Sequence, residues 1–169
     1  MFRSFALAGA VVVGLSGCIG GFGGVRQELP VPLEITLSAA ERVNPTEAGR
    51  PSPIVVRVFE LSNSAAFQSA DFFALQDGGS GATGEVVESE EYVLVPGEVR
   101  VVRKRAALNS RFLGVVAGYR DLEGSVWRAV VPLPAPHLAG RVWAGATSPK
   151  QGFYIVLGER AVMIREAPR

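Results

Sequence analysis

Short runs in which apolar and polar residues alternate restrict the fold of this chain more than any other feature. In residues 33–38, LEITLS, leucine and isoleucine alternate with glutamate, threonine and serine. Because successive side chains of a strand point to opposite faces, this period predicts a strand with one buried face. Further valine-rich runs follow at short intervals, separated by turn residues among the 20 glycines and 11 prolines. The pattern is typical of an all-β domain.

The runs and turns together predict seven or eight strands. Residues 54–61 are apolar on both faces apart from Arg57 and Glu60, which indicates a central strand between two layers. Strands are also expected on both sides of three turns, at residues 96–97, 121–124 and 158–159. The proline-rich residues 132–151 are expected to form a long irregular connection. A two-layer β-sandwich accommodates this strand count.

Residues 62–76, SNSAAFQSADFFALQ, predict one or two short helices inserted into the sandwich. The N-cap candidates are Ser62, Ser64 and Asp71. Hydrophobic core is the simplest role for the aromatic residues, because aromatic side chains dominate core burial. The alternative is a pocket for a small apolar ligand beneath Phe67, Phe72 and Phe73.

The first 17 residues have the layout of a secretory signal peptide: a positive charge at Arg3, an apolar stretch and then small residues. The apolar stretch falls short of the roughly 20 residues that a membrane-spanning helix needs. The sequence Leu-Ser-Gly-Cys that ends at Cys18 has the form of a bacterial lipobox. This form implies that the Cys18 thiol carries diacylglycerol and that cleavage occurs before it. The alternative is a buried core cysteine, since a chain with one cysteine cannot form an internal disulfide.

The expected domain organisation follows from this cleavage site. Residues 1–17 are the signal peptide, residues 18–32 are the lipidated cysteine and a glycine-rich flexible tether, and residues 33–169 are the β-sandwich domain. Loss of Arg3 with the signal leaves 16 acidic and 16 basic residues, so the mature chain is formally neutral. A neutral chain argues against nucleic-acid binding, which normally requires a basic face. Ile19 stands where many Gram-negative lipoproteins retained in the inner membrane have aspartate, so the outer membrane is the expected destination.

Few residues combine into a catalytic or metal-binding pattern. His137 is the single histidine, and no serine lies in a nucleophile-elbow motif, so neither a catalytic triad nor a zinc site is expected. The acidic residues Glu88, Glu90 and Glu91 suggest a metal or acid–base site as one alternative. The other is an edge strand protected by charge, with Glu88 and Glu90 on the face of Tyr92. We favour the edge strand and predict a protein that is not an enzyme, with no catalytic residue, bound metal or cofactor apart from the covalent lipid.

Residues 103–105, Arg-Lys-Arg, form a short basic run. A lipid or nucleic-acid surface is one interpretation. Three charges are few, and alternation places Lys104 opposite Arg103 and Arg105, so an exposed strand end is the favoured interpretation.

Residues 42–53, RVNPTEAGRPSP, contain three prolines and predict a long, stiff loop. Such a loop is either a rigid connector, whose prolines only reduce the entropy of the unfolded chain, or a preordered interaction surface.

Several segments together resemble the TssJ (VasD, SciN) lipoproteins of the bacterial type VI secretion system. They are VNPTEAGRPSPIVVRVFELSNSAAFQSADFFAL at residues 43–75, LVPGE at 94–98, LGVVAGYRD at 113–121 and VWR at 126–128. Each short segment alone is weakly specific. Their joint order behind a lipobox carries the resemblance, which extends over nearly all of the mature chain.

The resemblance implies a transthyretin-like β-sandwich with an added helical element. It also implies a lipoprotein in the inner leaflet of the outer membrane that faces the periplasm and binds the C-terminal domain of the inner-membrane protein TssM, and through it TssL. The family contacts TssM mainly through the loop between its first two strands, which corresponds here to residues 42–53. The residues implied to shape or make this contact are Arg42, Asn44, Pro45, Gly49, Arg50, Pro51 and Pro53. No family contact can be placed in residues 77–84, where this sequence is unusually rich in glycine.

The expected function is therefore structural: a lipoprotein that tethers TssM to the outer membrane within the envelope-spanning membrane complex. The alternative is a periplasmic lipoprotein that carries a small apolar ligand.

Overall fold

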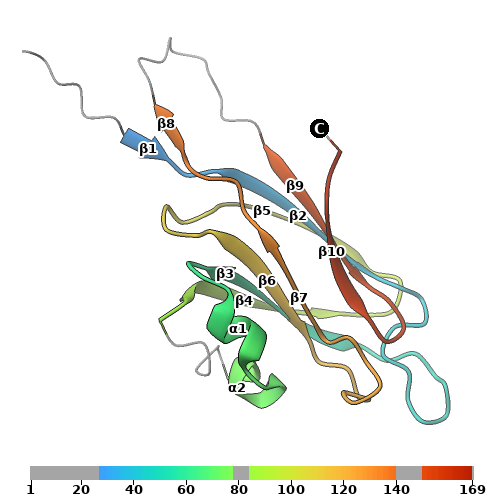
Figure 1. The fold of residues 1–169 in the computed structure, drawn as a ribbon. Coiled ribbons are helices and arrows are strands. Elements are labelled where there is room, and N and C mark those ends of the chain that lie inside the picture. The colour runs from blue at the N-terminus through green and yellow to red at the C-terminus, as the bar shows by residue number, and fades with distance from the viewer. Residues whose placement is uncertain (1–26, 78–83, 140–149, 169) are drawn as a thin grey trace, which may run out of the picture.

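The computed structural model describes residues 27–77, 84–139 and 150–168, and in this part of the chain it contains ten strands and two short helices (Figure 1). The strands are β1 (Gln27–Leu29), β2 (Pro32–Ala39), β3 (Ile54–Leu61), β4 (Val86–Leu94), β5 (Val99–Arg105), β6 (Phe112–Ala117), β7 (Arg128–Pro132), β8 (His137–Ala139), β9 (Gln151–Leu157) and β10 (Val162–Glu166). The helices are α1 (Ala65–Ser69) and α2 (Phe72–Gln76). Two four-stranded sheets, ordered β10-β9-β2-β5 and β4-β3-β6-β7, pack face to face, and β1 pairs with β8. The all-β sandwich with an inserted helical segment is confirmed.

The first sheet is built around β2, which pairs antiparallel with β5 and parallel with β9. Its burial alternates at every residue, as the sequence predicted. Leu33, Ile35 and Leu37 point into the sandwich and are at most 2% exposed. Because the opposite face of this sheet is polar at Glu34 and Thr36, β2 has one buried and one solvent-facing side.

The second sheet is built around β3, which pairs antiparallel with β4 and β6. Ile54 and Val56 point into the space between the sheets. Phe59 and Leu61 point to the other face, where they form a second core with residues of α1 and α2. The central position predicted for this strand is confirmed, and the helices explain why it is apolar on both faces (Figure 1).

The two helices begin with different caps. The side chain of Asp71 accepts a hydrogen bond of 2.9 Å from the amide of Ala74, which is the expected N-cap of α2. Ser64 precedes α1 but makes no side-chain cap bond, and the carboxamide oxygen of Asn63 instead accepts from the amide of Ala65. Ser64 therefore has the position of an N-cap residue but does not make the capping hydrogen bond.

The aromatic cluster is divided between the core and the surface. Phe67 is fully buried, with its ring centroid 5.3 Å from that of Phe59 in an edge-on arrangement. A Cβ added to Gly114 would lie 2.8 Å from the ring of Phe67, so β6 approaches this ring as closely as packing allows. Phe73, by contrast, is 68% exposed. Phe67 belongs to the core, and Phe73 lies on the surface.

Two segments differ from the sequence prediction. Residues 27–29, placed in the flexible tether, form β1, and residues 137–139, placed in an irregular connection, form β8. The two segments pair antiparallel over three residues, so His137 lies in a strand rather than in a loop. Three residues are too few to show an alternating period, which is why neither strand could be found from the sequence. The predicted signal peptide and Cys18 lie outside the described residues.

The sandwich has two distinct ends, which we call the β1 end and the loop end. At the β1 end lie β1, the start of β2 and the residues that pair with it, Arg105 on β5 and Gln151 on β9. At the loop end lie residues 40–53, which join β2 to β3, and the turn between β9 and β10 (Figure 1). The eight residues of β2 separate these ends by about 25 Å at roughly 3.3 Å per residue.

Candidate functional site

The candidate site is the surface formed by residues 42–53 and the neighbouring turns at the loop end. Within this loop the amide of Gly49 donates to the carbonyl of Thr46 at 2.8 Å, and the amide of Thr46 donates to the carbonyl of Arg50 at 2.8 Å. Gly49 has φ +71°, a conformation in which a side chain would be strained. The loop tip is therefore a closed turn with a fixed backbone.

Asn44 connects this loop to the two turns beside it. Its Nδ2 donates to the carbonyl of Pro53 at 2.8 Å, and its Oδ1 accepts from the amide of Arg120 at 2.8 Å. Its own amide donates to the carbonyl of Glu159. Asn44 is only 3% exposed and has φ +49°, a left-handed conformation that asparagine tolerates better than most residues. The resemblance implies that Asn44 shapes or makes the partner contact; its burial favours shaping, and its role toward a partner stays a prediction.

Ser52 and Tyr119 complete the support of the loop. The buried hydroxyl of Ser52 donates to the carbonyl of Asn44 and accepts from Nε of Arg120 at 3.1 Å. The hydroxyl of Tyr119 donates to the carbonyl of Gly158 at 3.2 Å, and burial raises the pKa of this phenol. Three chain segments that are far apart in sequence are thus held in one arrangement before any partner is bound.

The remaining predicted contact residues lie largely on the surface. Pro45 is half-buried, and five residues are exposed: Arg42, Gly49, Arg50, Pro51 and Pro53. The Arg42 side chain is 75% exposed and lies 3.6 Å from the carboxylate of Glu159, a pair that contributes little in water. The structure brings these residues together on one surface, and their contact with a partner stays a prediction.

An open cleft of about 650 Å³ lies beside the loop. It is lined by Pro45, Thr46, Glu47, Ala48, Arg50, Arg120, Asp121 and Arg160. Arg160 holds Asp121 at 3.1 Å between Nη1 and Oδ2, so the turns after β6 and β9 form one wall of the cleft. The sequence alone does not point to Arg120, Asp121 and Arg160, because only the strand topology brings their turns next to residues 42–53.

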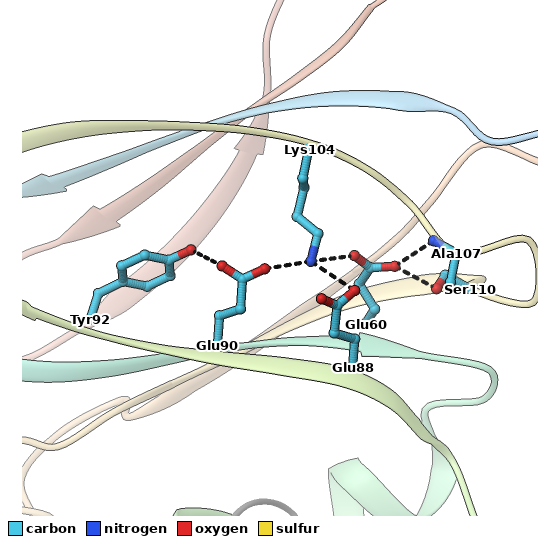
Figure 2. A network of polar contacts seen from close by, with 7 residues as sticks. All are labelled: Glu60, Glu88, Glu90, Tyr92, Lys104, Ala107 and Ser110. Atoms are coloured by element: carbon cyan, nitrogen blue, oxygen red, sulfur yellow. Dashed lines mark hydrogen bonds and ion pairs between the residues drawn. The ribbon is translucent and has the colours of Figure 1, made fainter.

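A second polar cluster lies between the two sheets near the β1 end (Figure 2). Lys104 on β5 reaches across the sandwich to Glu60 on β3, with Nζ 2.8 Å from Oε1, and to Glu88 and Glu90 on β4 at 3.0 and 2.6 Å. The other oxygen of Glu60 accepts from the amide of Ala107 and the hydroxyl of Ser110. The exposed position predicted for Lys104 is wrong, although Arg103 and Arg105 do face solvent.

Charge pairing explains how ionised groups lie inside this sandwich. Burial opposes the charge of Lys104, but its hydrogen bonds to three carboxylates outweigh burial and raise its pKa. The hydrogen bond from Lys104 lowers the pKa of Glu90, while burial and the hydrogen bond to Glu90 raise the pKa of Tyr92 to about 12. The pKa shifts of Lys104 and Glu90 follow from pairing between the sheets, whereas that of Tyr92 follows from burial and from a contact within β4. Glu91 lies on the opposite face of β4 and pairs with Arg57, so the predicted alternation on this edge strand is confirmed.

The described residues offer few other features. Among them, no group of three or more His, Cys, Asp or Glu side chains is arranged to hold a metal ion. No helix in the described ranges is long and apolar enough to cross a membrane.

The fold and the loop end define a small transthyretin-like β-sandwich that presents a rigid, multi-turn surface at one end. The model of one family, described as type VI secretion lipoprotein (T6SS-SciN; VasD, EvfM, TssJ), matches residues 31–157. The chain belongs to this family of type VI secretion lipoproteins.

Solved structures agree with this assignment. The T6SS lipoprotein TssJ1 from Pseudomonas aeruginosa is 35% identical with a TM-score of 0.72, and the match covers 83% of this chain and 99% of that one. Serratia marcescens Lip, a membrane-bound component of the type VI secretion system, is 31% identical with a TM-score of 0.69 and the same coverage of both chains. A chain in a structure of the T6SS protein TssM C-terminal domain from EAEC shares the fold at 23% identity and a TM-score of 0.57, with 82% of this chain and 98% of that chain covered. No curated protein sequence gives a match.

Proposed function

We propose that this protein tethers the periplasmic C-terminal domain of TssM to the inner leaflet of the outer membrane, with lipid on Cys18 as the anchor and residues 42–53 as the main contact. Membership of the type VI secretion lipoprotein family supports the proposal. Further support comes from the occurrence of a chain with this fold in a structure of the TssM C-terminal domain. The role is structural, and TssL is joined only indirectly, through TssM.

The observation that carries the proposal is the position of the two ends. Any chain that precedes Gln27 joins the sandwich at the β1 end, whereas residues 42–53 follow β2 at the other end (Figure 1). A lipid held at Cys18 and a partner held at the loop end would therefore lie on opposite sides of a rigid body. This arrangement suits a tether, because the membrane does not cover the binding surface.

The fixed backbone of residues 42–53 suits recognition of a partner protein. Asn44 and Ser52 fix the loop backbone from inside, so the exposed residues between them lose little conformational entropy when a partner docks.

A pull-down with a purified TssM periplasmic domain tests the contact. The protein is the mature chain with Cys18→Ser, and in the test variant residues 45–51 are replaced by a Gly-Ser segment while Asn44 and Ser52 are kept. Because the buried supports remain, the sandwich should fold and binding should be lost. Arg103→Gln combined with Arg105→Gln, at the opposite end, is the matched control and should bind normally.

Retained binding in the loop variant would sink the assignment of residues 45–51. Membrane fractionation tests the other half of the proposal: Cys18→Ser should release the full-length protein from the outer-membrane fraction. Persistent attachment of that variant would refute the lipid anchor.

A further inference from the structure

Exposed basic side chains gather on the outer face of the first sheet, at the β1 end. Strand register places Arg105 across from Pro32, and Arg103 across from Glu34 one row further along. Lys150 directly precedes β9, whose first residue pairs with Leu33. All three cations face solvent, and they line one shallow hollow of about 280 Å³ together with Glu34.

The hollow keeps a positive balance because it has three exposed cations and one carboxylate. Nε of Arg103 lies 2.7 Å from Glu34, and the hydrogen bond and charge of Arg103 lower the pKa of Glu34. The next row of the same face holds Val101, Thr36 and Tyr154, which carry no charge at neutral pH. Along β2 and its two neighbours the positive charge is thus confined to the β1 end.

Chain length brings this end close to the lipid. Gln27 lies nine positions after Cys18 in the sequence, and nine residues reach at most about 32 Å when fully extended. The β1 end is therefore held within that distance of the bilayer if Cys18 is lipidated. The anchor raises the local concentration of the basic side chains at the membrane, so that contacts with lipid that would be too weak in solution become significant.

We propose that Arg103, Arg105 and Lys150 contact the headgroups of anionic phospholipids and orient the sandwich with its loop end away from the membrane. This inference rests on the proposed lipid anchor but not on TssM binding. Each basic side chain at an anionic surface gives a preference of about fivefold over a neutral one. Three such residues are enough to bias the orientation of a domain that is already anchored. They are too few to hold a domain without an anchor at the membrane.

The sequence itself provides the test. Cys18 is the only cysteine, so the unlipidated mature chain can be coupled through it to a maleimide lipid in vesicles. Lys104 and Lys150 are the lysines of the sequence, and only Lys150 is exposed, so the rate of acylation by an amine-reactive reagent reports on this end. We expect acylation of Lys150 to be at least about threefold slower on vesicles of phosphatidylethanolamine with phosphatidylglycerol than with phosphatidylcholine. High salt should remove the difference.

Two variants separate headgroup contact from a general effect of the charged surface. Arg42→Lys places a reporter lysine at the loop end, and its acylation should be equally fast on both vesicles. Arg103→Gln combined with Arg105→Gln should restore the faster rate at Lys150, with an unchanged melting temperature as evidence of folding. Equal rates at Lys150 on the two vesicles would overturn the proposal, and so would slowing that persists in the double variant. Because the anchor is chemical, neither result depends on lipidation in the cell.

Discussion

Asn44 shows at the scale of one residue why the loop end has a defined shape. Replacing it by alanine removes two hydrogen bonds and leaves the carbonyl of Pro53 and the amide of Arg120, both in partly buried contacts, without their partner. It also places an alanine side chain at φ +49°, a conformation that asparagine tolerates better. We expect Asn44→Ala to lower the free energy of unfolding by about 2–4 kcal/mol. Asn44→Gly loses the same bonds but relieves the backbone, so it should be about 1 kcal/mol more stable than Asn44→Ala in urea unfolding. Equal stabilities would show that the backbone conformation carries no cost.

Lys104 and Glu60 form a pair in which each charge depends on the other. The Glu60 side chain is 2% exposed and the Lys104 side chain 17% exposed, so Lys104→Met leaves a buried carboxylate without its counter-charge and should cost about 3 kcal/mol. Adding Glu60→Gln removes that charge but keeps an oxygen for Ala107 and Ser110. The double variant should therefore be more stable than Lys104→Met alone. A double-mutant cycle in urea measures this, and simple additivity would contradict the pairing.

Glu90 gives the same cluster a dependence on pH. Its pKa lies below the ordinary value of 4.5 in the folded protein, mainly because Lys104 donates to it. A carboxyl group with a lowered folded pKa contributes stability above its unfolded pKa, and this contribution is lost as the pH falls. The free energy of unfolding should therefore decrease below about pH 4.5, and the decrease should be shallower in Glu90→Gln. Parallel curves for the two proteins would show that Glu90 is not the titrating group.

At the scale of strands and helices, an element can be predicted from the sequence only where it is long enough to show an alternating pattern or is marked by turn residues. β2, β3 and the hairpin of β9 and β10 are long enough for alternation or turn residues to mark them. β1 and β8 are three residues each, and they pair over a separation of more than 100 residues, for which no local pattern exists. Glu60 is a charge in an apolar strand, and only the register of β5 reveals its partner. The binding surface was predictable as far as one stiff loop, because prolines mark it locally, whereas its cleft depends on topology.

Arg128 fixes α1 to the second sheet. Its Nη1 donates to the carbonyls of Phe67 and Ala70, each at 2.8 Å, and its guanidinium lies 4.7 Å from the ring centroid of Trp127. Lysine cannot reproduce this planar contact with the indole, so Arg128→Lys should weaken the docking of both helices by about 1–2 kcal/mol. Hydrogen exchange should then become faster in α1 and α2 but not in β3.

Arg111 offers a matched control for this prediction. Its Nη1 also donates to two carbonyls, those of Leu108 and Ser110, but on a different part of the surface. Arg111→Lys should leave exchange in α1 and α2 unchanged. Faster exchange in the helices of both variants would mean that the effect is global destabilisation rather than loss of a specific contact.

At the scale of the whole molecule, a tether requires both ends on one polypeptide. A chain with Cys18→Ser keeps the loop end but lacks the lipid, and a chain with residues 45–51 replaced by Gly-Ser keeps the lipid but lacks the predicted contact. If the protein bridges TssM to the membrane, neither variant should bring the TssM periplasmic domain into the outer-membrane fraction. Co-expression of the two variants should also fail, because the functional ends then lie on different molecules. Recovery of TssM in that fraction on co-expression would show that the two ends act without a covalent link, through an assembly that joins separate copies.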